Sequence, residues 1–239
     1  MSPVIIALDF PSQEATLDFL TPFTNEPTLF VKVGMELFYT AGPQILAELR
    51  ARGCQVFLDL KLYDIPHTVE QTMVQLGRQG VALVTIHAAG GAAMIQAAKR
   101  GLVTGSRLAG VAPAKLLAVT QLTSTSEAQM RTDQQVTVSL ERSVQHLARL
   151  AWQNGADGVI AAAPEDPLIH ATTSPDFACI NPGIRPANAA ADDQQRVVTP
   201  QRAAELGSNG LVIGRPITQA ADPLAVYHQI LQEWGQSTC

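Results

Sequence analysis

The chain has 239 residues, 46% of them hydrophobic and 15% charged, and its formal net charge is −5. This length suits one large domain or two small ones, and the composition is that of an ordinary globular enzyme or binding protein. The acidic balance disfavours nucleic acid and anionic membranes as main partners, because both attract basic surfaces. No basic, apolar leader and no apolar run long enough to span a bilayer is present, so we expect a soluble protein that stays in the cytoplasm.

Short apolar runs recur along the chain and are nearly continuous rather than alternating, as in strands that are covered on both faces. They predict strands within residues 4–10, 29–35, 55–61, 83–89, 116–122, 158–164, 177–183 and 210–216.

Segments with helical spacing lie between these runs, at residues 12–23, 42–53, 65–80, 91–101, 137–155 and 222–235. We expect Ser12 to cap the first helix and Gly53 to end the second. The helices that start near residues 65, 91 and 137 are also expected to end at glycines. Two polar stretches, residues 123–135 and 185–195, are the least regular and fall where a barrel places its lid loops.

Eight strands, each followed by a helix, predict a (β/α)8 TIM barrel that forms a single domain over residues 1–239. The alternative is a doubly wound open sheet. That fold would want a glycine-rich turn after the first strand, whereas the sequence there is DFPSQE.

The third apolar run carries unexpected charges: the stretch FLDLKLYDIPHT contains Asp59, Lys61 and Asp64. Residues two apart on a strand share a face, so the first two are expected to meet. A buried ion pair that holds the barrel mouth would explain those two alone. Asp9 and Lys32 fall at the same ends of the first two strands, and five charges are a costly way to stiffen a rim. The pattern therefore favours a functional site.

An anion site is predicted after the last two strands, where NPGIR and VIGRPI each place a glycine beside an arginine, Arg185 or Arg215. Phosphate-binding barrels use these two loops, and arginine forms charge-assisted bonds to phosphate. A solvated surface arginine is the alternative for either residue alone. We expect His87 to be a hydrogen-bonded rim or core histidine.

No metal-ligand spacing, dinucleotide fingerprint, P-loop or serine elbow is present. The cysteines Cys54, Cys179 and Cys239 are scattered, so we expect reduced structural thiols. The chemistry is expected to use side chains alone or a metal held by carboxylates.

The motifs IIALD, FVKVGMELF, FLDLKLYDIPHTV, HAAGG, AVTQLTS, NPGIR and VIGRPI, in this order from first strand to last, resemble the bacterial-type orotidine 5'-phosphate decarboxylase family. The D-x-K-x-x-D core alone is shared with sugar-phosphate decarboxylases. Lys32 and the phosphate signature from Gln194 to Arg215 make the resemblance specific. It implies a homodimeric barrel that converts orotidine 5'-phosphate to UMP and CO2, the last step of de novo UMP synthesis, with no cofactor and no metal.

The resemblance also implies roles for individual residues. Lys61 matches the lysine that protonates C6, and Asp59 matches the carboxylate beside the departing carboxyl group. Asp64 and Thr68 match residues that reach into the neighbouring subunit's site. Tyr63 and His67 depart from the family pattern at positions without a catalytic role.

The remaining matches are substrate contacts: Asp9 and Lys32 for the ribose, Thr123 and Ser124 for the pyrimidine edge, and Gln194, Gly214 and Arg215, with Arg185 beside them, for the phosphate. Two other functions stay open. A metal-dependent sugar-phosphate decarboxylase would want an acid in place of Lys32, and a non-catalytic nucleotide-binding barrel would bind UMP without releasing CO2.

Overall fold

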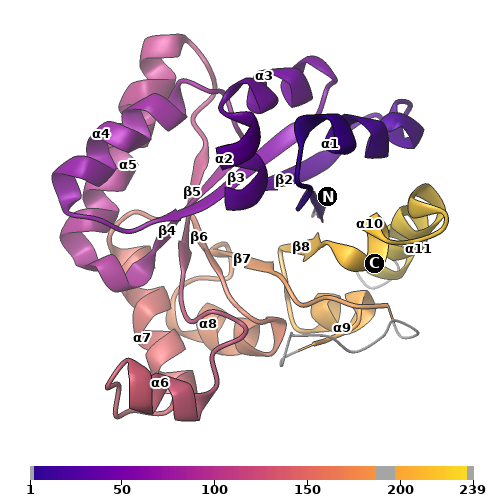
Figure 1. Ribbon diagram of the computed structural model, residues 1–239. Coiled ribbons are helices and arrows are strands. Elements are labelled where there is room, and N and C mark those ends of the chain that lie inside the picture. Colours follow the sequence, from indigo (N-terminus) through magenta and orange to yellow (C-terminus); the bar gives the residue numbers. More distant parts are fainter. Residues whose placement is uncertain (1–2, 187–196, 236–239) are drawn as a thin grey trace.

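The computed structural model describes residues 3–186 and 197–235, and its strands form one closed parallel barrel in the order of the sequence (Figure 1). The strands are β1 (Val4–Ala7), β2 (Phe30–Gly34), β3 (Gln55–Leu62), β4 (Leu83–His87), β5 (Lys115–Val119), β6 (Gly158–Ile160), β7 (Ala178–Asn181) and β8 (Gly210–Ile213). The predicted (β/α)8 TIM barrel is confirmed, and the open doubly wound sheet is excluded. The assignment of residues 1–239 to a single domain stays a prediction.

Helices surround the barrel in Figure 1. They are α1 (Gln13–Phe19), α2 (Met35–Ala41), α3 (Gln44–Ala51), α4 (Pro66–Gly77), α5 (Gly91–Ala109), α6 (Glu127–Asp133), α7 (Leu140–Gln153), α8 (Asp166–Thr172), α9 (Pro200–Glu205), α10 (Arg215–Thr218) and α11 (Pro223–Gly235). Short 3-10 turns cover Thr21–Phe23, Ala88–Gly90 and Ala163–Glu165. Among the helices described, none is long and apolar enough to cross a membrane.

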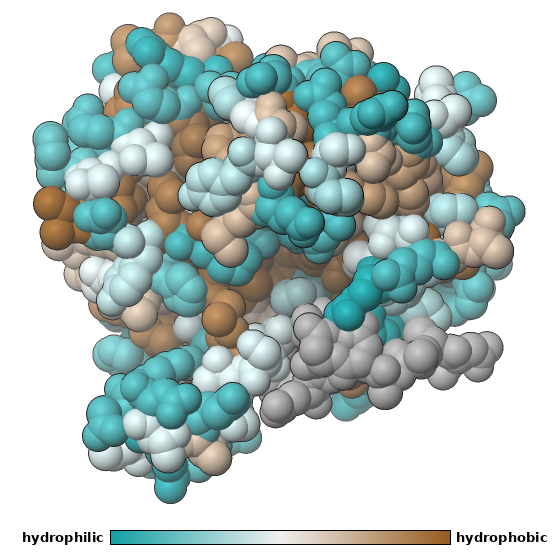
Figure 2. All heavy atoms as spheres, in the orientation of Figure 1, coloured by the Kyte–Doolittle hydropathy of each residue, from teal (hydrophilic) through white to brown (hydrophobic). Residues whose placement is uncertain are grey.

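Both faces of the strands are buried, which explains their continuous apolar sequence. In β1, Ile5 and Ala7 belong to a small cluster inside the barrel, whereas Val4 and Ile6 belong to the large cluster under the helices. Each fully buried aliphatic side chain contributes about 1.5–3 kcal/mol of transfer free energy. In Figure 2, polar side chains cover most of the visible surface, and hydrophobic atoms show between them.

The expected caps of the first two helices are largely found. Ser12 caps α1, since its hydroxyl accepts the backbone N–H of Ala15 at 3.1 Å. Helix α3 ends one residue earlier than expected: Arg52 is its C-cap, and Gly53 follows with a φ of 83°. That left-handed conformation is the one glycine adopts without a steric cost.

The expected end of helix α5 at Gly101 is wrong, because the helix continues to Ala109. A Cβ on Gly101 would collide with the carbonyl oxygen of Glu70, and one on Gly105 with that of Val74. These glycines therefore let α5 lie directly against α4, and they do not end the helix. The two helices run side by side in Figure 1.

The polar stretch at residues 123–135 is more regular than expected, because it contains α6. Ser126 and Gln129 form a capping box: the hydroxyl of Ser126 accepts the Gln129 N–H at 3.2 Å, and the Gln129 side chain accepts the Ser126 N–H at 3.0 Å. This S-x-x-Q spacing was a readable signal for a helix start. Of the second expected lid, residues 185–195, the part from 187 onward lies outside the described residues.

Candidate active site

Four charged side chains meet at the C-terminal ends of the first three strands. The Nζ atom of Lys61 lies 2.8 Å from Oδ2 of Asp59, and that of Lys32 lies 3.8 Å from the same oxygen. Lys32 also donates a hydrogen bond to Oδ1 of Asp9 at 3.0 Å. Acids and amines thus alternate in the order Asp9, Lys32, Asp59, Lys61, and each buried charge has a partner of opposite sign. We call these four residues the charged cluster.

Lys61 reaches Asp59 in a different way from the one expected. Strand β3 loses its register with β4 between Leu58 and Leu62, and Lys61 has a φ of 51°. This left-handed conformation is unfavourable for a side chain with a Cβ, and such strain often occurs at functional sites. Simple two-residue alternation along a regular strand is therefore not what aims Lys61 at the carboxylate.

Thr85 in the neighbouring strand β4 holds this irregular segment. Its hydroxyl accepts the backbone N–H of Lys61 at 2.9 Å and donates to Oδ1 of Asp59 at 2.9 Å. Thr85 is fully buried. Sequence reasoning missed this residue, although a polar side chain inside the apolar run LVTIH was a usable signal.

Gly34 is a second residue that the sequence did not single out. A Cβ on this residue would lie 3.1 Å from Oδ1 of Asp9 and 3.2 Å from Nζ of Lys32. A larger residue would therefore press on the ion pair between these two side chains. No pattern in a single sequence distinguishes this glycine from one that merely ends a strand.

A cavity of about 600 Å³ opens beside the charged cluster. Both Asp9 and Lys32 line it, and so do Arg185, Gly214 and Arg215 from the ends of β7 and β8. Two members of the charged cluster and the two arginine loops, predicted separately from the sequence, therefore share one cavity. Asp59 and Lys61 do not line it and adjoin it through Lys32, whose Nζ lies 3.8 Å from Asp59. This volume suits a small-molecule ligand. Its other lining residues are Ala7, Phe10, Pro182, Gly183, Ile184, Val212, Thr218 and Gln219.

The turn after β7 has a defined backbone. Gly183 has a φ of 79°, and its carbonyl oxygen accepts the N–H of Val198 at 3.3 Å. The N–H of Arg185 donates to the carbonyl oxygen of Val198 at 3.0 Å. The predicted phosphate contact Gln194 lies outside the described residues. After β8, Gly214 is the N-cap of the short helix α10, which begins with Arg215.

The other predicted site residues lie around this centre. Asp64 and Thr68 are exposed, in the β3–α4 connection and the first turn of α4, and an oxygen of Asp64 accepts the N–H of Ile65 at 2.6 Å. Among the contacts of the described residues, none joins Asp64 to Lys61. After β5, Thr123 is buried and Ser124 is exposed.

The sequence matches the model of the family described as "Orotidine 5'-phosphate decarboxylase / HUMPS family" over residues 2–230. The chain belongs to this family. The predicted resemblance is thereby confirmed.

Individual relatives cover nearly the whole chain. The orotidine 5'-phosphate decarboxylase of Latilactobacillus sakei subsp. sakei (strain 23K) is 56% identical over 233 residues, and that of Lactiplantibacillus plantarum is 57% identical over 233 residues; each match covers 98% of both chains. The crystal structure of orotidine 5'-phosphate decarboxylase from Lactobacillus acidophilus superposes with a TM-score of 0.87 at 42% identity, covering 98% of this chain and 99% of that one. The predicted enzyme class, carboxy-lyase, is confirmed by these relatives.

His87 is the last residue of β4, lies beside the charged cluster and is partly buried; the hydrogen bond expected for it is not among the contacts of the described residues. Burial lowers the pKa of its imidazole below the usual range, and the nearby charge of Lys61 lowers it further, against the opposing effect of Asp59. The ring lies 6.1 Å from that of Tyr63. A neutral histidine at this position does not compete with Lys61 for the negative charge of the acids.

Metal-ligating side chains are not gathered in the described part of the chain, where no group of three or more His, Cys, Asp or Glu could hold an ion. Cys54 and Cys179 are buried free thiols, and burial raises the pKa of both. Cys239 lies outside the described residues. The absence of any cofactor requirement stays a prediction.

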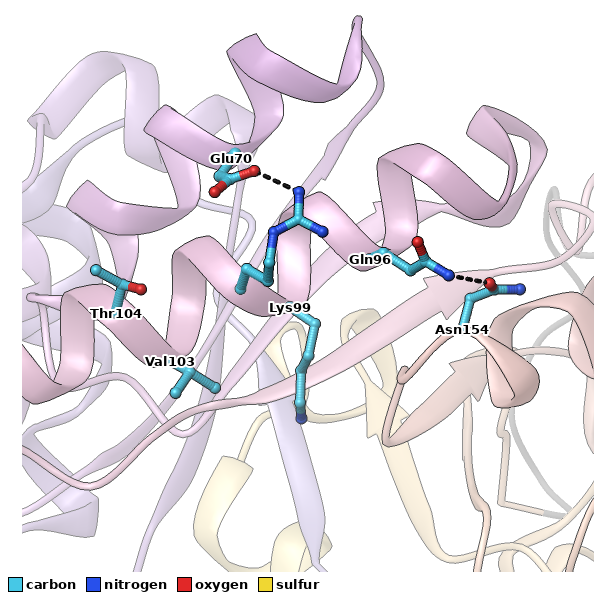
Figure 3. Close-up of a pocket in the computed structure, with 7 residues that line it drawn as sticks. Glu70, Gln96, Lys99, Val103, Thr104 and Asn154 are labelled. Carbon is cyan, nitrogen blue, oxygen red and sulfur yellow. Dashed lines mark hydrogen bonds and ion pairs between the residues drawn. The ribbon is translucent and has the colours of Figure 1, made fainter.

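A second hollow of about 570 Å³ lies in the outer helix layer (Figure 3). In this view Gln96 and Asn154 point toward each other, and their side-chain amides are joined by a 2.8 Å hydrogen bond. The two cations that line this hollow are already in ion pairs: Arg100 with Glu70 and Lys99 with Asp157, both at 2.6 Å. We therefore assign no chemistry to this hollow.

Proposed function

We propose that this chain converts orotidine 5'-phosphate to UMP and CO2, the final step of de novo UMP synthesis, without a metal or cofactor. The observation that carries the proposal is one cavity that is lined by Asp9, Lys32 and both arginine loops, with Asp59 and Lys61 joined to Lys32 at its edge. The cavity thus has a charged end, beside Lys32, and an arginine end. A nucleotide substrate would place its reacting base toward the first and its phosphate toward the second. The names of the relatives support the same substrate.

In the proposed reaction, Lys61 meets the charge that decarboxylation creates. The bond between C6 of the pyrimidine and its carboxyl carbon breaks, CO2 leaves, and the electron pair stays on C6. An ammonium group held against C6 stabilises this developing carbanion and then donates a proton to it, and solvent returns a proton to the amine. No separate electron sink is needed.

The acids of the cluster prepare Lys61 for this step. Asp59 holds its ammonium at 2.8 Å and is itself held by Thr85, so the cation is positioned before substrate arrives. Such preorganisation lowers the barrier because little reorganisation is needed during the reaction. In the proposed complex, Asp59 also lies beside the departing carboxylate.

The remaining site residues would bind the parts of the substrate that do not react. Asp9 and Lys32 are proposed to contact the ribose hydroxyls, and Thr123 with Ser124 the pyrimidine edge. The phosphate contacts are proposed to be Arg185, Gln194, Gly214 and Arg215. Binding energy from the phosphate, remote from C6, can then be used to close the site and exclude water.

We further propose a homodimer in which Asp64 and Thr68 complete the partner's site. Both side chains are exposed, as is Tyr63, and Ile65 next to Asp64 is 65% exposed. Tyr63 and Ile65 are thus two large side chains exposed close together, and exposed apolar patches rimmed by polar residues are typical of protein interfaces. A mixture of Lys61→Ala and Asp64→Ala homodimers tests this proposal. If sites are shared, each heterodimer regains one complete site and activity reappears; if no activity returns, the shared site is wrong.

The assay that tests the main proposal is CO2 release from orotidine 5'-phosphate in metal-free buffer with a chelator. Release at an undiminished rate supports the cofactor-free reaction. Activity that requires Mg²⁺ would instead support the metal-dependent sister enzyme, although Lys32 stands where that enzyme would want an acid. UMP binding without CO2 release would support a non-catalytic barrel. The cytoplasmic location stays a prediction.

A further inference from the structure

A buried carboxylate that the proposed reaction does not use lies behind the phosphate half of the cavity. Asp166, the first residue of α8, is fully buried. One of its oxygens accepts the side-chain amide of Asn181 at 2.9 Å, and the other accepts the hydroxyl of Ser208 at 2.6 Å. Within the described residues, no cation pairs with Asp166. A buried carboxylate held by neutral donors alone is costly, so its position calls for an explanation.

Asn181 connects this carboxylate to the cavity. It is the last residue of β7 and directly precedes Pro182 and Gly183, which line the cavity. Its amide nitrogen donates both to Asp166 and to the carbonyl oxygen of Ala161 at 3.0 Å. Its amide oxygen accepts nothing from the described residues. The orientation of Asn181 is therefore set by its two acceptors.

The backbone ladder at this place is short. Strands β7 and β8 are in register at only two pairs, Ile180 with Gly210 and Asn181 with Leu211, whereas β2 and β3 are in register at five. Ser208 lies just before β8. Asn209, between Ser208 and β8, is also bonded to Cys179 of β7: its N–H donates to the Cys179 carbonyl oxygen, and its side-chain oxygen accepts the Cys179 N–H, both at 2.8 Å. The side-chain bonds from Asp166 add a further connection between β7 and the segment that leads into β8, the two strands whose loops carry the arginines.

We propose that Asp166 is a positioning residue for the phosphate half of the site. By holding Asn181 and Ser208 together, it fixes the turn at residues 182–185 relative to β8, and so fixes the spacing of Arg185 and Arg215. It contacts no substrate, since it is fully buried. This inference rests on the proposed function, because it takes the ligand between the two loops to be a nucleotide phosphate.

The variant Asp166→Ala removes both acceptors and tests the proposal through UMP binding. We expect the Kd for UMP to rise about tenfold. This is the change in binding that the net contribution of about one hydrogen bond would produce. Binding of uridine, which lacks the phosphate, should not change. Asp166→Asn keeps an acceptor for Asn181 and a polar contact to Ser208, so it should bind UMP as the unchanged protein does.

A matched control separates positioning from general loss of stability. Ser106 is equally buried, and its hydroxyl donates to the carbonyl oxygens of Gly77 and Leu102 between α4 and α5. Ser106→Ala should lower thermal stability without changing the Kd for UMP. All variants are compared at temperatures where circular dichroism shows them fully folded.

Three results would overturn the inference: an unchanged Kd for UMP in Asp166→Ala, equal weakening of UMP and uridine, or a similar rise in Ser106→Ala. If Asp166→Ala does not fold, Ser208→Ala removes one of the two bonds and should still weaken UMP binding about threefold; unchanged binding there also overturns the inference. Failure of the proposed function would show differently, as an absence of CO2 release by the unchanged protein.

Discussion

The Thr85 hydroxyl accepts the backbone N–H of Lys61 at 2.9 Å, at the point where β3 leaves its register with β4. The same hydroxyl donates to Asp59. One buried side chain thus holds both the unusual backbone of the proposed proton donor and the carboxylate that orients its ammonium. Thr85 is therefore expected to affect catalysis through position, without contact with the substrate.

Thr85→Val keeps the size of the side chain and removes both hydrogen bonds. We expect kcat for orotidine 5'-phosphate to fall about 10- to 100-fold with little change in KM, because a bond to a charged group contributes about 1.5–3 kcal/mol. Thr85→Ser restores the hydroxyl and should stay close to the unchanged enzyme. Steady-state kinetics check this, and a kcat for Thr85→Val equal to that of Thr85→Ser would contradict the positioning role.

Lys61→Ala removes the proposed proton donor. We expect CO2 release to fall by many orders of magnitude while the thermal unfolding curve stays near that of the unchanged protein, since Lys61 is only partly buried. Single-turnover assays at high enzyme concentration extend the measurable range. A modest loss of rate would show that another group protonates C6.

Arg215→Ala removes a proposed phosphate contact. We expect a large rise in KM for orotidine 5'-phosphate, and partial recovery of rate when a phosphate-type dianion is added with a truncated substrate. Arg52→Ala at the end of α3, which removes an exposed ion pair with Glu48, serves as the control and should change neither quantity. No response to the dianion would mean that the phosphate loops are not coupled to catalysis.

Gly105→Ala tests the close contact between α5 and α4. The added methyl group would collide with the carbonyl oxygen of Val74, so we expect a loss of about 1–3 kcal/mol in the free energy of unfolding. At Gly235, near the end of α11, a Cβ meets nothing within 4 Å. Gly235→Ala should therefore cost nothing, and urea denaturation of both variants gives the comparison.

Asp166 predicts a pH dependence of stability. Burial raises its pKa from 3.8 to about 7, against the lowering effect of bonds from Ser208 and Asn181. Between these values the unfolded chain has lost this proton and the folded protein still holds it, so stability falls as the pH rises from about 4 to 7. The loss is on the order of 4 kcal/mol. Asp166→Asn removes this dependence. The urea midpoint of the variant, relative to that of the unchanged protein, should therefore be higher at pH 8 than at pH 4. Equal differences at the two pH values would contradict the shifted pKa.

Much of the fold could be predicted from the sequence, because strands that are buried on both faces have continuous apolar sequences. The end of α5 was misread because Gly101 looks like a helix stop, whereas its role depends on Glu70 of a neighbouring helix. Local sequence does not reveal such a contact between elements. Helix α6, in contrast, carried a readable capping box at Ser126.

The site was predictable to the extent that barrel topology alone brings strand ends together. That rule places Asp9, Lys32 and Asp59 at one rim without any knowledge of packing. The contributions of Thr85 and Gly34 depend on the register shift in β3 and on distances between side chains. These are properties of three-dimensional packing, and spacing along one chain does not encode them in a readable form.

The joint between β7 and β8 has two residue pairs in register, whereas every other joint of the barrel has at least three. In the proposed complex, the nucleotide phosphate binds the loops above both strands and so connects them at the joint with the fewest residue pairs in register. Protein with bound nucleotide should then resist proteolysis longer than protein without it. Under the proposed function, the time for which the protein survives a protease should therefore increase with the nucleotide concentration.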